Sequence, residues 1–252
     1  MKGNNTSRIL FEDNHLLIVN KRPGEIVQGD KTGDEPLVES LKSYIKEKYN
    51  KPGEVYLGLV HRLDRPVSGA VVFARTSKAL TRMNELMKKR DVRKVYWAIS
   101  PHPVPPPIRG GSEGGGLTAG WIHLIHYIKR NEQQNKSYVY DLPGEGRQKA
   151  ELKYRILASG DRYDLLEIEL LTGRHHQIRA QLAAIGCPIK GDLKYGFPRS
   201  NPDGSISLHA RLIEFLHPVS KNPIAVEAPV PEEKLWELLV KLVPPGPSLR
   251  SG

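Results

Sequence analysis

The sequence predicts an α+β fold whose sheet is mixed and mostly antiparallel. Stretches with the length and composition of β-strands outnumber the segments with helical spacing. Strands and helices rarely alternate along the chain, which argues against a doubly wound parallel sheet. The chain has 252 residues, enough to bury a sizeable core, and we expect a single domain over residues 1–245.

The predicted strands are short apolar runs bounded by turn-forming residues. They lie at residues 15–20, 56–60, 69–74, 93–100, 121–129, 137–140, 150–157, 162–171, 207–215 and 224–228. The basic, turn-rich stretch at residues 21–24 follows the first strand, and a charged turn separates the second strand from the third.

The predicted helices lie at residues 35–49, 77–90, 174–185 and around 235–242. In the second helix Leu80, Met83 and Met87 share a face, which we expect to pack on the sheet. Thr172 stands where it could cap the third helix, which would place Arg174 in the first helical turn.

Two segments are predicted to lie outside regular structure. Residues 101–120 contain a proline-rich run followed by a glycine-rich run, which cannot form a helix or a central strand. We expect a flexible surface loop there and a disordered tail at residues 244–252.

The charge distribution indicates an anionic partner. The net charge is +10, and residues 61–94 carry ten Lys/Arg against three Asp/Glu. Residues 171–199 add a second basic block, so the excess is concentrated in two places. A solvated surface without a binding role would more often spread its charge, whereas two blocks are typical of the walls of a nucleic-acid site.

The sequence predicts a cytoplasmic protein. Its single cysteine, Cys187, rules out a disulfide bond within the chain, which fits a reducing compartment. The N-terminus lacks the apolar stretch of a signal peptide, and no window is apolar enough to span a membrane.

The densest cluster of chemically active side chains is the segment HRLDRPVSG, residues 61–69. It places Asp64 among His61, Arg62 and Arg65, in a turn between two predicted strands. Cations stabilise the ionised form of a nearby carboxylate, so we expect Asp64 to act as a nucleophile or base. The alternative is a structural salt bridge in a tight turn.

A second cluster is LTGRHHQIR, residues 171–179. It places Arg174 close to a strand end, where active-site groups often collect. The alternative is a capped helix with a solvated polar face. Adjacent histidines on a helix point about 100° apart and chelate poorly, so we expect no metal site at His175 and His176.

The segment KVYWA, residues 94–98, puts Lys94, Tyr96 and Ala98 on one face of a predicted strand. An aromatic ring there could stack on a nucleic-acid base, although an aromatic residue in a strand more often fills the core.

Taken together and in this order, the three segments resemble the motifs of RluA-type pseudouridine synthases. The stretch LIVNKRPG (residues 17–24) is similar to the opening motif of that family, and LHA and LHP (208–210 and 216–218) are similar to its closing motifs. The resemblance implies a mixed, mostly antiparallel sheet in two subdomains flanking a catalytic cleft. Because the resemblance begins near the first residues of the sequence, we expect the catalytic domain alone, without the accessory RNA-binding domain that many members carry.

The resemblance also implies a role for each motif residue. Asp64 would be the catalytic carboxylate, Arg174 its partner, and Tyr96 the residue that stacks on the target base. Leu171 would support that base, and Arg62 would hold the flipped-out nucleotide. We expect His61, Arg65 and Arg179 to contribute to substrate binding.

The implied reaction detaches uracil from the ribose, rotates it and reattaches it through carbon. No redox step, hydrolysis or transfer to another molecule occurs, so we expect neither cofactor nor metal. The partner would be structured RNA, an rRNA or tRNA stem-loop, bound by a monomer.

Two other functions have to be weighed. One is an RNA-binding or ribosome-assembly factor that has lost catalysis, against which the presence of Asp64, Tyr96 and Arg174 argues. The other is a metal-dependent hydrolase built on His61, His175 and His176, which chelator sensitivity would reveal.

Overall fold

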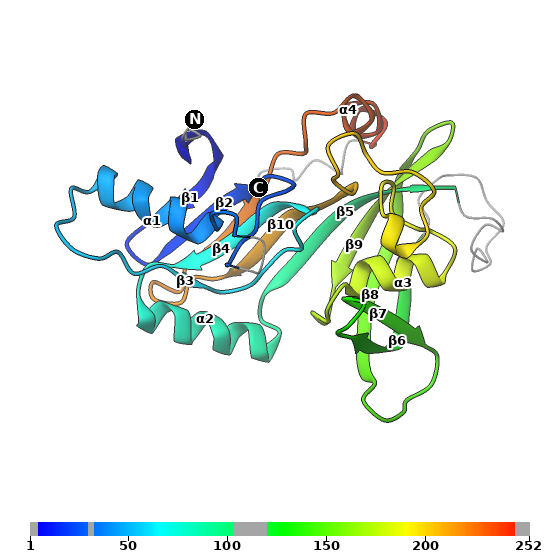
Figure 1. Ribbon diagram of the computed structural model, residues 1–252, viewed down its shortest axis with the longest axis horizontal. Helices are drawn as coiled ribbons and strands as arrows, with labels where there is room; N and C mark the ends of the chain where they lie inside the picture. Colours follow the sequence, from blue (N-terminus) through cyan, green and yellow to red (C-terminus); the bar gives the residue numbers. More distant parts are fainter. Residues whose placement is uncertain (1–4, 30–32, 103–119, 245–252) are drawn as a thin grey trace, which may run out of the picture. The chain divides into compact units, whose positions relative to one another are not determined.

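The computed structural model describes residues 5–29, 33–102 and 120–244, so the predicted loop and tail fall almost entirely outside it. The chain forms two compact units, one from Met1–Tyr96 and Ser200–Val230, the other from Trp97–Arg199 and Pro231–Gly252. Figure 1 shows the strands and helices that confirm the α+β prediction. None of the described helices is long and apolar enough to cross a lipid bilayer.

The first unit is built on a sheet with strand order β1-β2-β4-β10, to which β3 adds beside β4 and β11 beside β10. The β4–β10 pair is parallel, and the other pairs of this sheet with a defined register are antiparallel. Its elements are η1 (Asn5–Arg8), β1 (Ile9–Glu12), β2 (Leu16–Lys21), α1 (Leu37–Lys48), β3 (Gly58–Leu59), β4 (Ser68–Ala74), α2 (Ser77–Lys89), the start of β5 (Arg93–Pro101), β10 (Leu208–Leu216) and β11 (Pro223–Glu227).

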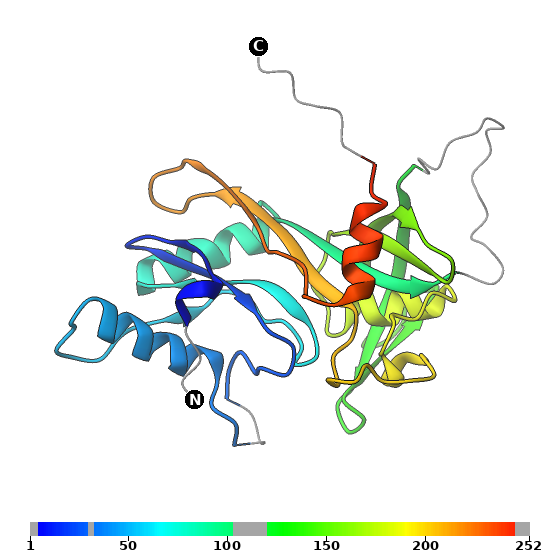
Figure 2. The ribbon, with the colours of Figure 1, turned by 90° about the horizontal axis from the view of Figure 1, so that it is seen from above.

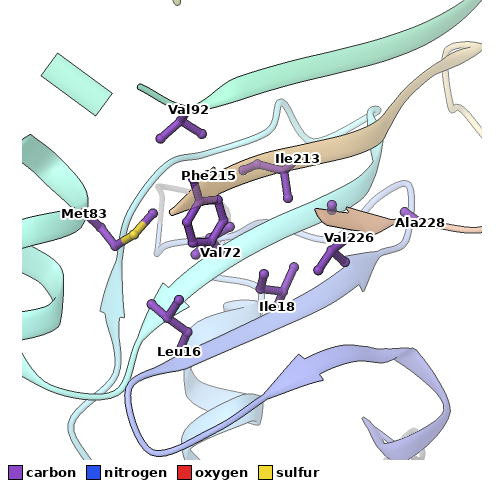
Figure 3. Packing of buried hydrophobic residues seen from close by; sticks show 10 residues of the cluster. Leu16, Ile18, Val72, Met83, Val92, Ile213, Phe215, Val226 and Ala228 are labelled. Atoms are coloured by element: carbon purple, nitrogen blue, oxygen red, sulfur yellow. The ribbon is translucent and has the colours of Figure 1, made fainter. Parts of the chain in front are cut away.

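Helices α1 and α2 lie on opposite sides of this sheet (Figures 1 and 2). Figure 3 shows the core between α2 and the strands, where Met83 meets Leu16, Ile18, Val72 and Phe215. The predicted apolar face of the second helix therefore packs as expected. Thr76 caps this helix by accepting the Ala79 N–H, which explains why its start was predictable.

The parallel β4–β10 contact is unusually close. Gly69 adopts a φ of +115° opposite Ala210, and a Cβ atom at Gly69 would overlap the Ala210 backbone. Next to it, the Ser68 hydroxyl lies 2.8 Å from Nδ1 of His209, and Nε2 of His209 lies 3.2 Å from the Ala228 carbonyl. Because the Nε2–H of His209 donates to the Ala228 carbonyl, Nδ1 accepts the Ser68 hydroxyl. The buried histidine thus connects the start of β4 to the residue that follows β11.

The second unit is an antiparallel sheet with strand order β9-β8-β6-β7. Helix α3 is buried on all sides, since six consecutive residues from Gln177 to Leu182 are inaccessible to solvent. The elements of this unit are the remainder of β5, β6 (Ile122–Asn131), β7 (Lys136–Tyr140), β8 (Gln148–Ser159), β9 (Tyr163–Leu170), α3 (Gln177–Ala184), η2 (Leu193–Tyr195) and α4 (Lys234–Lys241).

The structure corrects the predicted start of α3. The helix begins at Gln177, preceded by His176 in the left-handed region with a φ of 52°. Thr172 is therefore not its cap, and Arg174 lies in an irregular segment before the helix. The strand predicted at 56–60 is reduced to Gly58–Leu59, and the strand Ile9–Glu12 was not predicted.

Candidate active site

Asp64 lies in the turn between β3 and β4, and its surroundings fix the path of the backbone there. Backbone N–H groups reach three carbonyl oxygens of the turn: Val67 N–H to Asp64 (N···O 3.0 Å), Gly24 N–H to Arg65 (2.9 Å) and Ile206 N–H to Pro66 (3.1 Å). One bond within the turn and two from other parts of the first unit thus hold the turn in one conformation.

Lys21, the last residue of β2, supports the same turn from inside. Its side chain is 1% exposed, and its Nζ donates to the carbonyls of Arg22 (3.0 Å), Arg65 (3.0 Å) and Val67 (2.6 Å). Burial lowers the pKa of Lys21 to about 8, although the negative charges of Glu25 and Asp64 act in the opposite direction. All three ammonium hydrogens are used, so this lysine is part of the scaffold beneath Asp64.

Tyr96 lies within electrostatic reach of Asp64 in the same unit. The ring is 7% exposed, and burial, reinforced by the charge of Asp64, raises the pKa of the Tyr96 phenol well above its ordinary value. The phenol therefore stays neutral at physiological pH. Asp64 itself is partly exposed, so its carboxylate is open to solvent while the neutral Tyr96 ring is buried within electrostatic reach of it.

His61 is placed differently from the two arginines of its motif. Its Nε2 accepts the Val72 N–H at 3.3 Å, and burial together with the charge of Lys94 lowers the pKa of His61 to about 4. His61 is therefore neutral and supports β4. Arg62 is exposed, and Arg65 forms an ion pair with Asp34 at 2.7 Å in which both side chains are about half exposed.

In the second unit, the segment Leu171–His176 leaves β9 and crosses β8. The backbone N–H groups of Leu171 and Thr172 both donate to the Glu151 carbonyl at 3.1 Å. The Thr172 hydroxyl oxygen accepts the Glu151 N–H at 2.8 Å and donates to Oε1 of Gln177 at 2.7 Å. The threonine predicted as a helix cap instead ties the segment to β8.

Arg174 is held at two points. Its backbone N–H donates to Oε1 of Gln177 at 3.0 Å, and its side-chain Nε donates to the Lys149 carbonyl at 3.0 Å. The first bond gives the Arg174 N–H a side-chain partner in the irregular segment, and the left-handed conformation of His176 marks where α3 can begin.

His175 and His176 stack on each other with ring centroids 3.8 Å apart. Nδ1 of His175 lies 2.9 Å from the Ser137 hydroxyl, and Nδ1 of His176 lies 3.0 Å from the Tyr195 hydroxyl. Among the described residues, no group of three or more His, Cys, Asp or Glu side chains is arranged to hold a metal ion.

Arg179 has a position that changes its expected role. It forms a two-point ion pair with Asp192, with Nε–Oδ2 and Nη2–Oδ1 distances of 2.7 and 2.9 Å, and both side chains are buried. Because its guanidinium is bound to Asp192, Arg179 connects the first turn of α3 to the residue before η2. The buried ion pair favours a structural role for Arg179, and the expectation that it contributes to substrate binding stays a prediction.

The predicted site residues fall into two groups. The first unit holds His61, Arg62, Asp64, Arg65 and Tyr96, and the second holds Leu171, Arg174 and Arg179. Sequence reasoning missed the role of Lys21, which it placed in a basic turn. The available signal was a lysine two residues after the apolar run Leu16–Val19, still within the predicted strand's reach, where a buried charge needs a partner.

Comparison with known proteins gives a consistent result. Residues 15–184 match the family model described as RNA pseudouridylate synthase. The chain is 34% identical to ribosomal large subunit pseudouridine synthase D of Xanthomonas campestris, over 89% of this chain and 66% of that protein. It is 33% identical to the uncharacterized RNA pseudouridine synthase YhcT of Bacillus subtilis, over 89% and 69%. The chain thus spans about two thirds of the length of these relatives.

Among solved structures, human RNA pseudouridylate synthase domain containing 4 has the same fold. The TM-score is 0.72 at 24% identity, and the match covers 90% of each chain.

Proposed function

The chain belongs to the RNA pseudouridine synthase family, a family of isomerases, and from that premise we propose that it converts specific uridines of ribosomal RNA to pseudouridine, with Asp64 as the catalytic carboxylate. The observation that carries the proposal is a partly exposed carboxylate, Asp64, on a turn that backbone bonds and Lys21 hold in place and within electrostatic reach of the neutral, buried Tyr96. Two relatives with matching sequence are named for the large ribosomal subunit, which supports rRNA as the substrate class.

The proposed chemistry needs a carboxylate that can approach the sugar or the ring of a uridine. A base inside a helix is out of reach, so the nucleotide must leave its stack, at a cost of a few kcal/mol. Stacking on Tyr96 offsets part of that cost, since base–aromatic stacking contributes about 1–3 kcal/mol. The restrained turn keeps Asp64 in place while the uracil detaches and rotates.

The remaining roles follow the family resemblance. In the proposal Arg174 pairs with Asp64, Leu171 supports the base opposite Tyr96, and the exposed Arg62 and Arg65 bind the RNA backbone. The reaction needs no cofactor. We place a single copy of the chain in the cytoplasm, where structured RNA with the target uridine is available.

The decisive experiment maps pseudouridine in total rRNA and tRNA from cells with and without the gene, complemented by wild type, Asp64→Asn or Asp91→Asn. Asp91 is an exposed carboxylate of the same unit and serves as the matched control. We expect one or a few rRNA sites to vanish on deletion, to return with wild type and Asp91→Asn, and to stay absent with Asp64→Asn. In purified protein the rate should fall at least about 10³-fold.

Other outcomes lead to other conclusions. If the pseudouridine sites that vanish on deletion lie only in tRNA, the substrate class is tRNA and not rRNA. If the Asp64→Asn variant restores every pseudouridine site, Asp64 is not the catalytic carboxylate. If RNA binding is found but every pseudouridine persists in the deletion, the chain is an RNA-binding factor rather than an enzyme.

A further inference from the structure

Lys94 occupies a distinctive place in the first unit. It lies on β5 two residues before Tyr96, so the alternation of a strand puts the two side chains on the same face, about 7 Å apart along the strand. The side chain is partly buried. It is also close enough to His61 for its charge to lower the pKa of that ring.

Among the residues that the structure describes, Lys94 is a cation without a counter-charge. Within the part of the chain that the structure describes, no ion pair or hydrogen bond involves its ammonium group. Burial lowers the pKa of Lys94, and no carboxylate acts against that effect, whereas Asp64 does so for Lys21. His61 is neutral and supplies no charge. An ammonium group that is partly buried without an opposite charge raises the free energy of the folded protein.

The other cations nearby have simpler explanations. Lys88, Lys89 and Arg90 are exposed at the end of α2, where positive charge interacts favourably with the helix dipole. Arg93 forms an ion pair with Glu214 at 2.5 Å. Lys21 bonds three carbonyls. Lys94 alone of these lacks both full solvation and a partner among the described residues.

An anion brought by the ligand would compensate this charge. A nucleotide whose base lies on Tyr96 carries its phosphates a short distance away along the RNA backbone, and a compact ammonium is suited to a phosphate as a point charge. The same strand face would then contact a base through Tyr96 and the backbone through Lys94.

We propose that Lys94 is a phosphate-binding residue that holds the RNA backbone at or next to the nucleotide whose base stacks on Tyr96. This inference rests on the proposed function. It assigns to Lys94 a role in binding rather than in chemistry, and it explains why a destabilising charge is placed beside the candidate catalytic turn.

The test uses full-length protein and unmodified transcripts of large-subunit rRNA and of tRNA. Binding is measured across a range of salt concentrations in the Asp64→Asn background, with Lys94→Met, Lys94→Arg and Lys46→Met compared. Lys46 is an exposed lysine of α1 and controls for the loss of one charge from the surface. The same lysine variants are made in the wild-type background for thermal unfolding and steady-state kinetics.

We expect Lys94→Met to weaken binding about 10-fold at low salt. The slope of log K against log salt should become shallower by about 0.7–0.9, the value for one phosphate contact. KM should rise with kcat nearly unchanged, and Lys94→Arg should restore most of the affinity. The melting temperature should stay constant or rise, because methionine removes an uncompensated charge.

The opposite pattern overturns the inference. A fall in melting temperature with unchanged affinity and salt slope would make Lys94 a structural residue. If wild type isomerises RNA and Lys94→Met has the same KM, only the phosphate site is refuted. A third outcome is that RNA binding shows the expected change of salt slope in Lys94→Met, but wild type never isomerises the RNA. The proposed function then fails, and the phosphate site remains supported. Absence of RNA binding by wild type refutes both.

Discussion

The Asp64 turn and the Leu171–His176 segment are both irregular stretches at strand ends, yet they are held in different ways. Backbone N–H groups and one buried ammonium hold the Asp64 turn, and all of these bonds end on its carbonyl oxygens. In the second segment two backbone N–H groups also reach the Glu151 carbonyl, but the other bonds involve side chains, those of Thr172, Gln177 and Arg174. The first arrangement depends on the path of the chain, the second on the identity of each residue.

The difference predicts how each region responds to substitution. In the turn, most replacements leave the carbonyl oxygens and their N–H donors in place, whereas loss of the Lys21 side chain removes two bonds to these carbonyls and should loosen the turn. In the second segment the bonds made by the side chains of Thr172, Gln177 and Arg174 can each be removed by a single substitution, while the two backbone bonds to the Glu151 carbonyl remain. The expected effects on stability test this difference, starting with the largest.

Arg179→Met tests the buried support of the second segment. It leaves the Asp192 carboxylate buried without its cation, so we expect the free energy of unfolding to fall by about 3–5 kcal/mol in urea titrations. Arg155→Met is the control, because the Arg155–Glu167 pair has a half-exposed arginine, and its loss should cost less than about 1 kcal/mol. Weakened RNA binding without loss of stability would restore the direct substrate role that the structure argues against.

Lys21→Met tests the support of the Asp64 turn. The carbonyls of Arg22 and Val67 lose their charged donor, and we expect the free energy of unfolding at pH 7 to fall by about 2–4 kcal/mol. Lys42→Met, at a surface i,i+3 pair with Glu39, is the control and should be nearly neutral. A stable Lys21→Met protein with unchanged activity would show that the backbone bonds alone suffice.

The same variant has a pH signature. The pKa of Lys21 is lowered from 10.5 to about 8, so between these values the unfolded chain binds a proton that the folded chain has released. The unfolding free energy of wild type should therefore rise with pH relative to Lys21→Met, by up to about 1.4 kcal/mol per pH unit. If the difference in unfolding free energy between wild type and Lys21→Met stays constant between these two pH values, the lowered pKa of Lys21 is contradicted.

Thr172→Val tests the side-chain bonds of the second segment at a single hydroxyl. The Glu151 N–H and Oε1 of Gln177 each lose a partner, so we expect a loss of about 1–3 kcal/mol. Activity should fall more than stability does, because Gln177 also positions the Arg174 backbone. Thr81→Val on the exposed face of α2 is the control. If Thr172→Val and Thr81→Val lower the free energy of unfolding equally, the side-chain bonds of Thr172 do not hold the second segment.

The sequence predicted best those elements whose signals are local. Helix α2 was placed within one residue at each end because its cap, its apolar face and its basic last turn all lie within the helix or beside it. The strand Ile9–Glu12 was missed because its four residues are all partly buried and show no alternation. Only pairing with β2 makes it a strand.

Long-range bonds decided the features that could not be predicted. The start of α3 depends on Gln177, whose side chain bonds Thr172 and the Glu151 carbonyl on β8, so local cap signals pointed to the wrong residue. Lys21 meets carbonyls 44 and 46 residues away. The candidate catalytic roles came from motif order, whereas Arg179 needed the structure to reveal Asp192 as its partner.

The parallel pairing of β4 with β10 also sets an order of events during synthesis. Ser68 and its partner His209 are 141 residues apart, so a ribosome must make the whole second unit, except its C-terminal segment, before the β4–β10 pair can form. Until then the start of β4, at Ser68 and Gly69, lacks its β10 partner and is open to aggregation, and the Ile206 bond to the Asp64 turn is missing. The turn is therefore completed only when the last fifth of the chain emerges. Nascent chains that stop before β10 should depend on chaperones to stay soluble.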